Sequence, residues 1–269
     1  MATPPQRPGF PARIDLGAGS RAPARPVARP AVPAAATPPL TSTSAPQAAS
    51  MARDPIPARA RMVQLLAAEG ISDAQVLRAM GSVDRHRFVD SALLAQAYED
   101  TALPIGLGQT ISKPSVVARM VELLMQGGLR GPDGKLGRVL DIGTGCGYQA
   151  VVLGQLASEV YSIERLRDLH EKARANLRPL RIANVHLILG DGMAGFAKGA
   201  PYAGIIAAAG GEAVPDAWID QLAYGGRIVA PVATAGGQQA LMVIDKSRQG
   251  IQQTILEAVH FVPLKSGVA

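Results

Sequence analysis

A glycine-rich stretch, LDIGTGCGY at residues 140–148, separates a run typical of a buried strand from a run typical of a helix. Glycines let the backbone come close to a ligand, and ligands of open parallel sheets bind where strands end. The stretch does not match G-x-G-x-x-G, because Tyr148 holds the sixth position counted from Gly143, and no Lys follows as a P-loop requires. It predicts a ligand-binding turn that does not cradle phosphates, although a tight turn without a ligand would explain the glycines alone.

Carboxylates come at or after the ends of three successive predicted strands, as Asp141, Glu164 and Asp191. A carboxylate at the end of the second strand can accept hydrogen bonds from both hydroxyls of a ribose, and Asp191 can bind an exocyclic amine or nearby backbone. Each acid alone is more often a strand-end cap or a turn residue. The three acids together with the glycines favour a nucleoside ligand that lacks a pyrophosphate.

The stretch GQTIS at 108–112 carries an amide and two hydroxyls ahead of the glycine-rich turn. Pro114 fits the first turn of a helix, where its missing N–H would have no partner anyway, and apolar residues at helical spacing follow as far as Gly127. On residue chemistry alone, Ser112 would be the N-terminal cap of this helix. A nucleophilic serine is disfavoured, because the pattern G-x-S-x-G is missing and none of the four histidines lies near Ser112 in the sequence.

Alternating strand and helix patterns must position these residues. Strands are predicted at 138–143, 159–164, 184–192, 203–209 and 226–232, and helices at 146–156, 166–178 and 215–223. The alternation predicts right-handed crossovers and an α/β fold with a doubly wound, mostly parallel sheet that is covered on both faces. The last part of the chain has strand patterns without helices between them, so it should add antiparallel strands at one edge. These patterns lie at 240–245, 252–257 and 258–264.

Helical patterns also occupy the region from residue 58 to residue 98. A first helix should end at Gly70, and Ser72 with Gln75 forms a capping-box arrangement that should start a second. The stretch SALLAQAY at 91–98 predicts a further short helix. The structured part of the chain is therefore expected to begin with an N-terminal helical layer.

Residues 1–55 are rich in Pro, Ala and Arg and poor in large apolar side chains, so they cannot offset their ordering entropy. We expect a disordered tail at 1–55 and one domain at 56–269. Seven Arg and two Asp in residues 1–60 account for +5 of the net charge of +6, so the remaining chain is nearly neutral. A solvated basic linker is the favoured interpretation of the tail, and a nucleic-acid or anionic-surface contact is the alternative.

The sequence lacks the features of membrane and secreted proteins. No stretch approaches the roughly 18 apolar residues of a membrane span, and the N-terminus lacks the apolar core of a signal peptide. The single cysteine, Cys146, cannot form an intramolecular disulfide and suits a reducing compartment. We therefore expect a cytoplasmic protein with no membrane partner.

The order D-x-G-x-G-x-G, then Glu, then D-G resembles the class I S-adenosylmethionine-dependent methyltransferases. More specifically, residues 58 to 267 resemble the protein-L-isoaspartate (D-aspartate) O-methyltransferases. The motifs that carry this second resemblance are ALPIGLGQTIS (102–112), SVVARMVELL (115–124), VLDIGTGCGYQA (139–150), LAYGGRIVAPV (222–232) and AVHFVPL (258–264). The resemblance implies a seven-stranded, Rossmann-like methyltransferase fold. It also implies a protein repair enzyme that methylates the α-carboxylate of L-isoaspartyl residues in damaged proteins.

The resemblance implies roles for individual residues. Ser112 becomes the active-site serine, with Thr110, Ile111 and Val262 at the substrate. The implied cofactor-binding residues are Asp141, Gly143, Thr144, Gly145, Glu164, Asp191 and Gly192. S-adenosyl-L-methionine is the implied co-substrate, and no metal is expected. We expect a monomer whose partners are isoaspartyl proteins and peptides and not nucleic acid.

The implied chemistry assigns a modest role to Ser112. A carboxylate is already ionised at neutral pH, so methyl transfer to it from a sulfonium needs no strong general base. The Ser112 hydroxyl is expected to donate a hydrogen bond that orients this carboxylate, while positioning and exclusion of water supply most of the catalysis. Two alternatives stay open, a methyltransferase for a small molecule or RNA and a non-catalytic S-adenosylmethionine-binding protein. The first is favoured if GQTIS and FVPL lie far from the cofactor pocket.

Two places depart from the pattern of the resembled family. Lys113, Pro114 and Ser115 stand where bacterial members usually read Q-P-Y, and Ala203 stands where an Asp is usual. That Asp lies near the cofactor in related methyltransferases. The resemblance therefore implies that Ala203 lies near the cofactor and affects cofactor affinity or a substrate contact.

Overall fold

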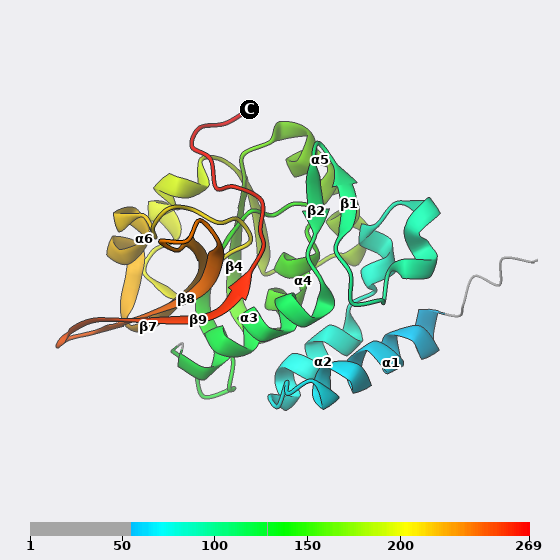
Figure 1. Cartoon of the computed structure of the whole chain (residues 1–269), viewed down its shortest axis with the longest axis horizontal. Helices are drawn as coiled ribbons and strands as arrows, with labels where there is room; N and C mark the ends of the chain where they lie inside the picture. Colours follow the sequence, from blue (N-terminus) through cyan, green and yellow to red (C-terminus); the bar gives the residue numbers. More distant parts are fainter. Residues whose placement is uncertain (1–54, 128) are drawn as a thin grey trace, which may run out of the picture. The chain divides into compact units, whose positions relative to one another are not determined.

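A seven-stranded sheet forms the centre of the structure, a computed structural model that describes residues 55–127 and 129–269 (Figure 1). Its strand order is β5-β4-β3-β6-β7-β8-β9. The strands are β3 Leu136–Ile142, β4 Ala157–Glu164, β5 Val185–Leu189, β6 Tyr202–Ala207, β7 Leu222–Ala233, β8 Gln239–Ser247 and β9 Gly250–Val259. Neighbouring strands from β5 to β7 are parallel, whereas β8 and β9 pair antiparallel. The predicted mostly parallel sheet with antiparallel C-terminal strands is confirmed.

Helices cover both faces of this sheet, as a doubly wound fold requires. The helices α3 Pro114–Gly127, α4 Tyr148–Leu156 and α5 Arg167–Leu177 bury apolar residues in one cluster with Val139 of β3. The helix α6 Asp216–Gln221 buries Trp218 in a second cluster with Leu140. Successive residues of a strand point to opposite faces, so the neighbours Val139 and Leu140 belong to different clusters.

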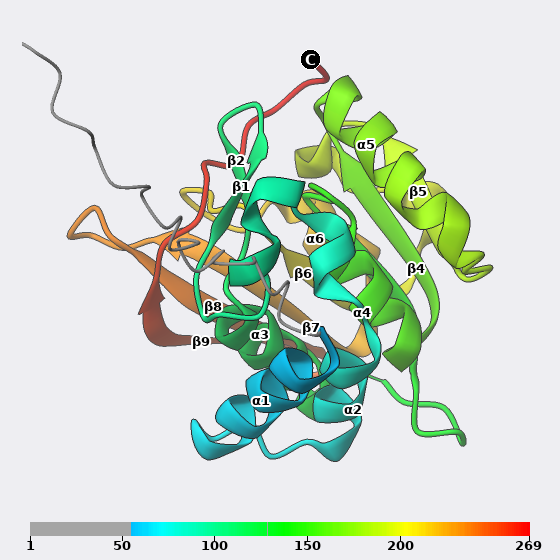
Figure 2. The ribbon, with the colours of Figure 1, turned by 90° about the vertical axis from the view of Figure 1, so that its right-hand side faces the viewer.

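The predicted N-terminal helical layer is also present. It consists of α1 Pro55–Ala68 and α2 Ala74–Ser82, which pack beside α3 and α4 (Figure 2), and of two short 3-10 helices, η1 Arg85–Phe88 and η2 Ser91–Gln96. The tail predicted at 1–55 lies outside the described residues, apart from Pro55, which begins α1. In the described parts of the chain, no helix has both the length and the apolar character needed to cross a bilayer.

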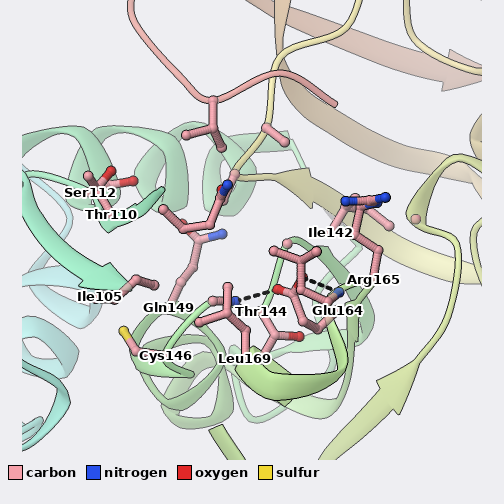
Figure 3. A pocket seen from close by; sticks show the side chains of 18 of the residues that line it. Ile105, Thr110, Ser112, Ile142, Thr144, Cys146, Gln149, Glu164, Arg165 and Leu169 are labelled. Carbon is pink, nitrogen blue, oxygen red and sulfur yellow. Dashed lines mark hydrogen bonds between the residues drawn. The ribbon is translucent and has the colours of Figure 1, made fainter. Parts of the chain in front are cut away.

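A hairpin that the sequence did not reveal precedes α3. Its strands are β1 Leu103–Gly106 and β2 Gln109–Ile111, and three successive residues at its tip, Gly106, Leu107 and Gly108, have φ values of 96°, 52° and 68°. Figure 3 shows Ile105 and Thr110 of this hairpin at the edge of a pocket. The separate strand predicted at 258–264 is wrong, because β9 continues to Val259 and the chain then makes only an isolated bridge at Pro263.

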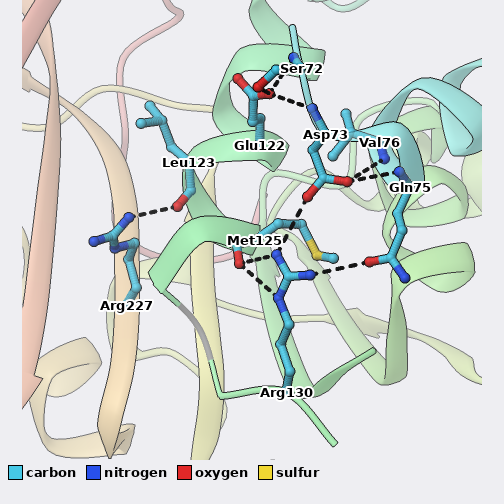
Figure 4. Close-up of polar contacts among 9 residues, drawn as sticks. All are labelled: Ser72, Asp73, Gln75, Val76, Glu122, Leu123, Met125, Arg130 and Arg227. Atoms are coloured by element: carbon cyan, nitrogen blue, oxygen red, sulfur yellow. Dashed lines mark hydrogen bonds and ion pairs between the residues drawn. The ribbon is translucent and has the colours of Figure 1, made fainter. Parts of the chain in front are cut away.

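The capping box predicted at Ser72 is also wrong. The cap of α2 is Asp73, whose Oδ1 accepts hydrogen bonds from the backbone N–H groups of Gln75 at 2.7 Å and Val76 at 3.3 Å (Figure 4). Ser72 instead donates from its backbone N at 2.7 Å and from its hydroxyl at 3.2 Å to Oε1 of Glu122 in α3. The same oxygen accepts from the backbone N of Asp73 at 2.9 Å. A buried carboxylate thus joins the start of α2 to the middle of α3.

Replacing Glu122 with Ala should destabilise the protein. The Glu122 side chain is 2% exposed, and its removal leaves the backbone N–H groups of Ser72 and Asp73 without their acceptor. We expect the free energy of unfolding, measured with urea, to fall by about 2–4 kcal/mol. The control is Glu257→Ala, which removes an exposed partner of Arg119 and should cost about 1 kcal/mol or less. A loss of similar size in both variants would contradict this account.

Candidate active site

A cavity of about 450 Å³ lies at the carboxyl ends of β3, β4 and β6. Residues at and directly after the ends of these strands line it, at 143–145, 164–166 and 208–209. The hairpin β1–β2 and the C-terminal segment 262–265 complete the lining. Because β4 and β6 lie on opposite sides of β3, this place is the switch point at which open parallel sheets bind ligands.

The glycine turn after β3 lies against both β4 and the hairpin. The backbone N–H groups of Gly143 and Thr144 donate to the Ile163 carbonyl at 2.9 and 3.1 Å. Gly145 has φ +55°, and a Cβ there would lie 3.2 Å from Cδ1 of Ile105 in β1. The glycine therefore allows a close approach between the turn and the hairpin. The predicted residues Gly143, Thr144 and Gly145 all line the cavity.

Glu164, the last residue of β4, lines the cavity beside this turn. Its Oε2 accepts a hydrogen bond from the backbone N of Gly145 at 2.9 Å, and its Oε1 accepts one from Leu166 at 3.0 Å (Figure 3). A carboxylate offers about four acceptor positions, so both oxygens can accept a further hydrogen bond. The structure places Glu164 where the sequence expected it, while its contact with a ribose stays a prediction.

Asp141 lies behind the cavity and not on its lining. The side chain is fully buried, with Oδ1 accepting from Nε2 of Gln149 at 2.8 Å and Oδ2 from the Ser162 hydroxyl at 2.7 Å. Burial raises the pKa of Asp141 to about 6, while these two hydrogen bonds lower it and the charge of Glu164 adds to the rise. Gln149 lines the cavity, and the Ser162 hydroxyl is 2.7 Å from that of Thr144. Asp141 thus orients lining residues, and its direct contact with a cofactor stays a prediction.

Asp191 holds the turn after β5 and the C-terminal segment. Its Oδ1 accepts from the backbone N of Met193 at 2.8 Å, and its Oδ2 accepts from the backbone N of Gly267 at 2.7 Å. Gly192, the next residue, lines the cavity, whereas Asp191 does not. Cofactor contacts of both residues stay predictions.

The residues predicted at the substrate lie around the same cavity. These residues are Thr110, Ile111, Ser112 and Val262. In Figure 3, Ser112 and Thr110 lie on one side of the pocket, and Glu164 and Arg165 lie on the other, with Thr144 and Gln149 between them. The structure therefore brings together the two groups of residues that the sequence assigned to acceptor and donor.

Ser112 does not cap α3, contrary to the expectation from residue chemistry alone. The cap is Asp100, whose carboxylate accepts from the backbone N and from the hydroxyl of Ser115, both at 2.8 Å. Within the described ranges 55–127 and 129–269, the Ser112 hydroxyl has no hydrogen-bond partner. The hydroxyl is thus available to a ligand in the cavity.

Several lining residues were missed by sequence reasoning. They are Ile105, Leu107, Gln149, Arg165 and Lys265. Gln149 could have been found, because it lies in the first turn of the helix that follows the glycine turn. Arg165 lines the cavity because it directly follows β4, whereas Ile105, Leu107 and Lys265 do so because the hairpin and residues 262–269 return to it. For example, the backbone N of Ala269 donates to the Arg165 carbonyl at 2.9 Å, and no local pattern encodes that return.

Ala203 lies away from the cavity, so its implied position near the cofactor is wrong. It is the second residue of β6 and is buried in the sheet, whereas Ala208 and Ala209 beyond the other end of this strand line the cavity. Ligands of a parallel sheet bind at carboxyl ends, and Ala203 is at the amino end. The alanine therefore gives no reason to expect a weakened site.

A sheet of this order and direction, a glycine turn after β3 and an acid at the end of β4 define a class I S-adenosylmethionine-dependent methyltransferase. Solved structures agree with this class. A protein-L-isoaspartate O-methyltransferase structure superposes with a TM-score of 0.69 at 29% identity, covering 78% of this chain and 67% of that one. A Plasmodium falciparum protein assigned to the same family was solved with S-adenosyl-L-homocysteine. It superposes with a TM-score of 0.65 at 25% identity, covering 77% of this chain and 98% of that one.

Sequence comparisons identify the family. The profile of the protein-L-isoaspartate(D-aspartate) O-methyltransferase family matches residues 58–269. A protein-L-isoaspartate O-methyltransferase from Methylibium petroleiphilum is 55% identical over 265 residues, which cover 97% of this chain and 96% of that one. A protein of the same name from Leptothrix cholodnii is 60% identical over 213 residues, which cover 78% of this chain and 74% of that one. The chain belongs to the protein-L-isoaspartate(D-aspartate) O-methyltransferase family, and the predicted enzyme class and methyl donor are confirmed.

Ionisation of Asp141 should make stability fall between about pH 4 and pH 6 in the protein without added cofactor. The pKa of Asp141 rises from 3.8 to about 6 on folding, so the folded state binds more protons in this interval and loses stability as the pH rises through it. Asp141→Asn removes the titrating group and keeps an acceptor for Gln149. As the pH rises from 4 to 7, the free energy of unfolding of this variant should increase by roughly 2–3 kcal/mol relative to that of the original protein.

Urea unfolding at closely spaced pH values measures this difference. Asp168→Asn, which changes an exposed carboxyl in the first turn of α5, is the control and should give a nearly constant difference. A constant difference for Asp141→Asn as well would show that Asp141 is not the group responsible.

Proposed function

We propose that the chain transfers a methyl group to the α-carboxylate of L-isoaspartyl residues in damaged proteins and peptides. One observation carries this proposal: residues 108–112 and 262–264 line a single cavity together with the glycine turn at 143–145. Segments far apart in the sequence thus meet where a donor and an acceptor would have to meet. Holding two reactants in a fixed orientation is the main source of rate for such a transfer.

The donor side of the cavity fits S-adenosyl-L-methionine. The volume of about 450 Å³ is in the range of small-ligand sites, and Glu164 offers carboxylate oxygens beside a turn without side chains at Gly143 and Gly145. Glu164 would accept hydrogen bonds from the ribose hydroxyls, and Gly192 would leave room for the remaining nucleoside. When bound, this co-substrate supplies a methyl group on a sulfonium sulfur. Within the described ranges, no group of three or more His, Cys, Asp or Glu could hold a metal ion.

The acceptor side needs only to hold and orient a carboxylate. The Ser112 hydroxyl would donate a hydrogen bond to one carboxylate oxygen and so direct the other oxygen toward the donor side. None of the described residues that line the cavity is a histidine, so Ser112 has no activating base of the usual kind beside it. Thr110, Ile111 and Val262 would surround the peptide and exclude water from the reacting oxygen.

The two alternative functions have less support. A methyltransferase for a small molecule or RNA would be favoured by GQTIS and FVPL segments remote from the pocket, yet both line it. A non-catalytic binding protein would be favoured by a departure from the family pattern at the cofactor pocket, and Ala203 lies at the end of β6 that is remote from the pocket. An isoaspartyl carboxylate therefore remains the favoured acceptor.

We also propose an organisation for the whole chain. Residues 56–269 would act as one catalytic domain with the tail 1–55 attached to it, and the enzyme would work as a monomer in the cytoplasm. A nearly neutral domain has little electrostatic attraction for nucleic acid. The single cysteine suits a reducing compartment.

The proposed acceptor is tested with two peptides that differ only in one residue, isoaspartate or normal aspartate. With labelled S-adenosylmethionine, we expect label in the isoaspartyl peptide alone, because only isoaspartate has a free α-carboxylate, whereas in normal aspartate that carboxyl group forms the peptide bond. The label should be released by mild base, as expected of a methyl ester. Equal labelling of both peptides, or of neither, would refute the proposed function.

Ser112→Ala should lower kcat/KM for the isoaspartyl peptide by about 10- to 100-fold, the value of one hydrogen bond to a charged acceptor. The affinity for S-adenosylhomocysteine, measured by calorimetry, should stay within about threefold. Ser115→Ala is the matched control, because Ser115 contacts Asp100 and does not line the cavity. A kcat/KM that is unchanged in Ser112→Ala would exclude the assigned role.

A further inference from the structure

The Arg85 side chain is fully buried and has no carboxylate partner within the described residues. Arg85 belongs to η1, outside the cavity lining. Burial lowers the pKa of its guanidinium, and the electrostatic influence of Tyr148, Cys146 and, least, Asp100 partly offsets this effect. A buried charge without an ion-pair partner is costly, and an apolar side chain of similar volume often fills such a site with better stability. The arginine must therefore contribute something that packing alone does not.

The guanidinium contacts three separate segments of the chain. Its Nε donates to the Ala97 carbonyl at 2.8 Å, and its Nη2 donates to the Ser112 carbonyl at 2.7 Å. Its central carbon lies 4.8 Å from the centre of the Tyr148 ring. The remaining nitrogen, Nη1, is buried and has no hydrogen-bond partner among the described residues. The planar guanidinium thus fixes the relative orientation of two segments, because two of its nitrogens donate to two backbone carbonyls.

Two of these segments, at Ser112 and Tyr148, belong to the two sides of the cavity. Ser112 follows β2 and supplies the proposed acceptor-side hydroxyl, whereas Tyr148 begins α4 directly after the glycine turn and lines the cavity. Arg85 holds the peptide group of Ser112 itself, so a change in this contact would move the Ser112 side chain. On the other strand of the hairpin, Lys172 of α5 donates to the Ile105 carbonyl at 2.7 Å. Cationic side chains therefore hold the hairpin in β1 and directly after β2.

We propose that Arg85 is a positioning residue for methyl transfer, which fixes the Ser112 hydroxyl relative to the glycine turn. The proposal rests on the proposed function, and it adds a residue that touches neither substrate. The hydrogen bonds of Arg85 go to Ala97 and Ser112, and it meets the donor side through the face of the Tyr148 ring. Its loss should therefore affect kcat far more than cofactor affinity.

Arg130 provides a matched control of the same residue type. It holds the Met125 carbonyl at the other end of α3 and also contacts Gln75 and Asp73 (Figure 4). Unlike Arg85, it has a carboxylate partner, is about one-third exposed and contacts no cavity residue. Arg130→Met should therefore change stability without changing the reaction.

The experiment compares Arg85→Met, Arg85→Lys and Arg130→Met with the original protein. Three measurements are made well below each melting temperature: kcat and KM for the isoaspartyl peptide, S-adenosylhomocysteine affinity by calorimetry, and amide hydrogen exchange of residues 103–113 without cofactor. For Arg85→Met we expect kcat to fall 10- to 100-fold, with KM and affinity within about threefold and faster exchange in the hairpin. Arg85→Lys keeps a charged donor but lacks the planar guanidinium, so its kcat should lie between those of Arg85→Met and the original protein. Arg130→Met should keep kcat and hairpin exchange unchanged.

An unchanged kcat in folded Arg85→Met, or an equal loss in Arg130→Met, would overturn the proposal. If Arg85→Met does not fold, Arg85→Lys decides, and an unchanged kcat with unchanged hairpin exchange would then overturn it. Failure of the proposed function is distinguishable, because the original protein would itself leave the isoaspartyl peptide unmethylated. Hairpin exchange would still report whether Arg85 holds Ser112, and unchanged exchange in both variants would count against the proposal.

Discussion

The reversal of strand order at β3 is the constraint on which the site depends. The neighbours of β3 are β4 on one side and β6 on the other, so the loops after these strands diverge and leave an opening at the carboxyl ends. The glycine turn and Glu164 border this opening from within the sheet. The hairpin β1–β2 and residues 262–265 border it from outside. Donor and acceptor residues can meet only because both sets converge on this one place.

Buried charged side chains hold several of the elements around the site in position. Asp141 binds the side chains of Gln149 and Ser162, Glu122 binds backbone N–H groups at the start of α2, and Arg85 binds two backbone carbonyls. Asp141 and Arg85 face neutral dipoles, whereas Glu122 also lies 3.6 Å from the guanidinium of Arg119. Neutral dipoles offset only part of the cost of burying a charge. These contacts fix the orientation of the groups that they join, because hydrogen bonds to charged groups are short and weaken when they are misaligned. For Asp141 and Arg85, whose partners include lining residues, the stability lost by burying a charge thus accompanies a fixed geometry of the cavity.

The sheet and much of the site could be predicted from the sequence. Alternating patterns predict β3 to β7 and their helices, and the motifs around Ser112, Gly143 and Glu164 identify both sides of the cavity. The hairpin could not be predicted in this way, because its strands are short and its turn depends on three left-handed residues. The contacts of Arg85 and the return of residues 262–269 depend on tertiary packing between distant segments. Asp141 and Asp191 were found as strand-end acids, but only the fold shows that they hold neighbouring segments and do not line the cavity.

The proposed function requires that the hairpin presents an isoaspartyl carboxylate to a methyl donor held beside Glu164. A crystal structure with S-adenosylhomocysteine and an isoaspartyl peptide tests this central claim most directly. We predict that the peptide α-carboxylate accepts a hydrogen bond from Ser112 Oγ and that its other oxygen faces the sulfur, with Glu164 at the ribose. A carboxylate bound away from Ser112, or a nucleoside bound away from Glu164, would contradict the claim.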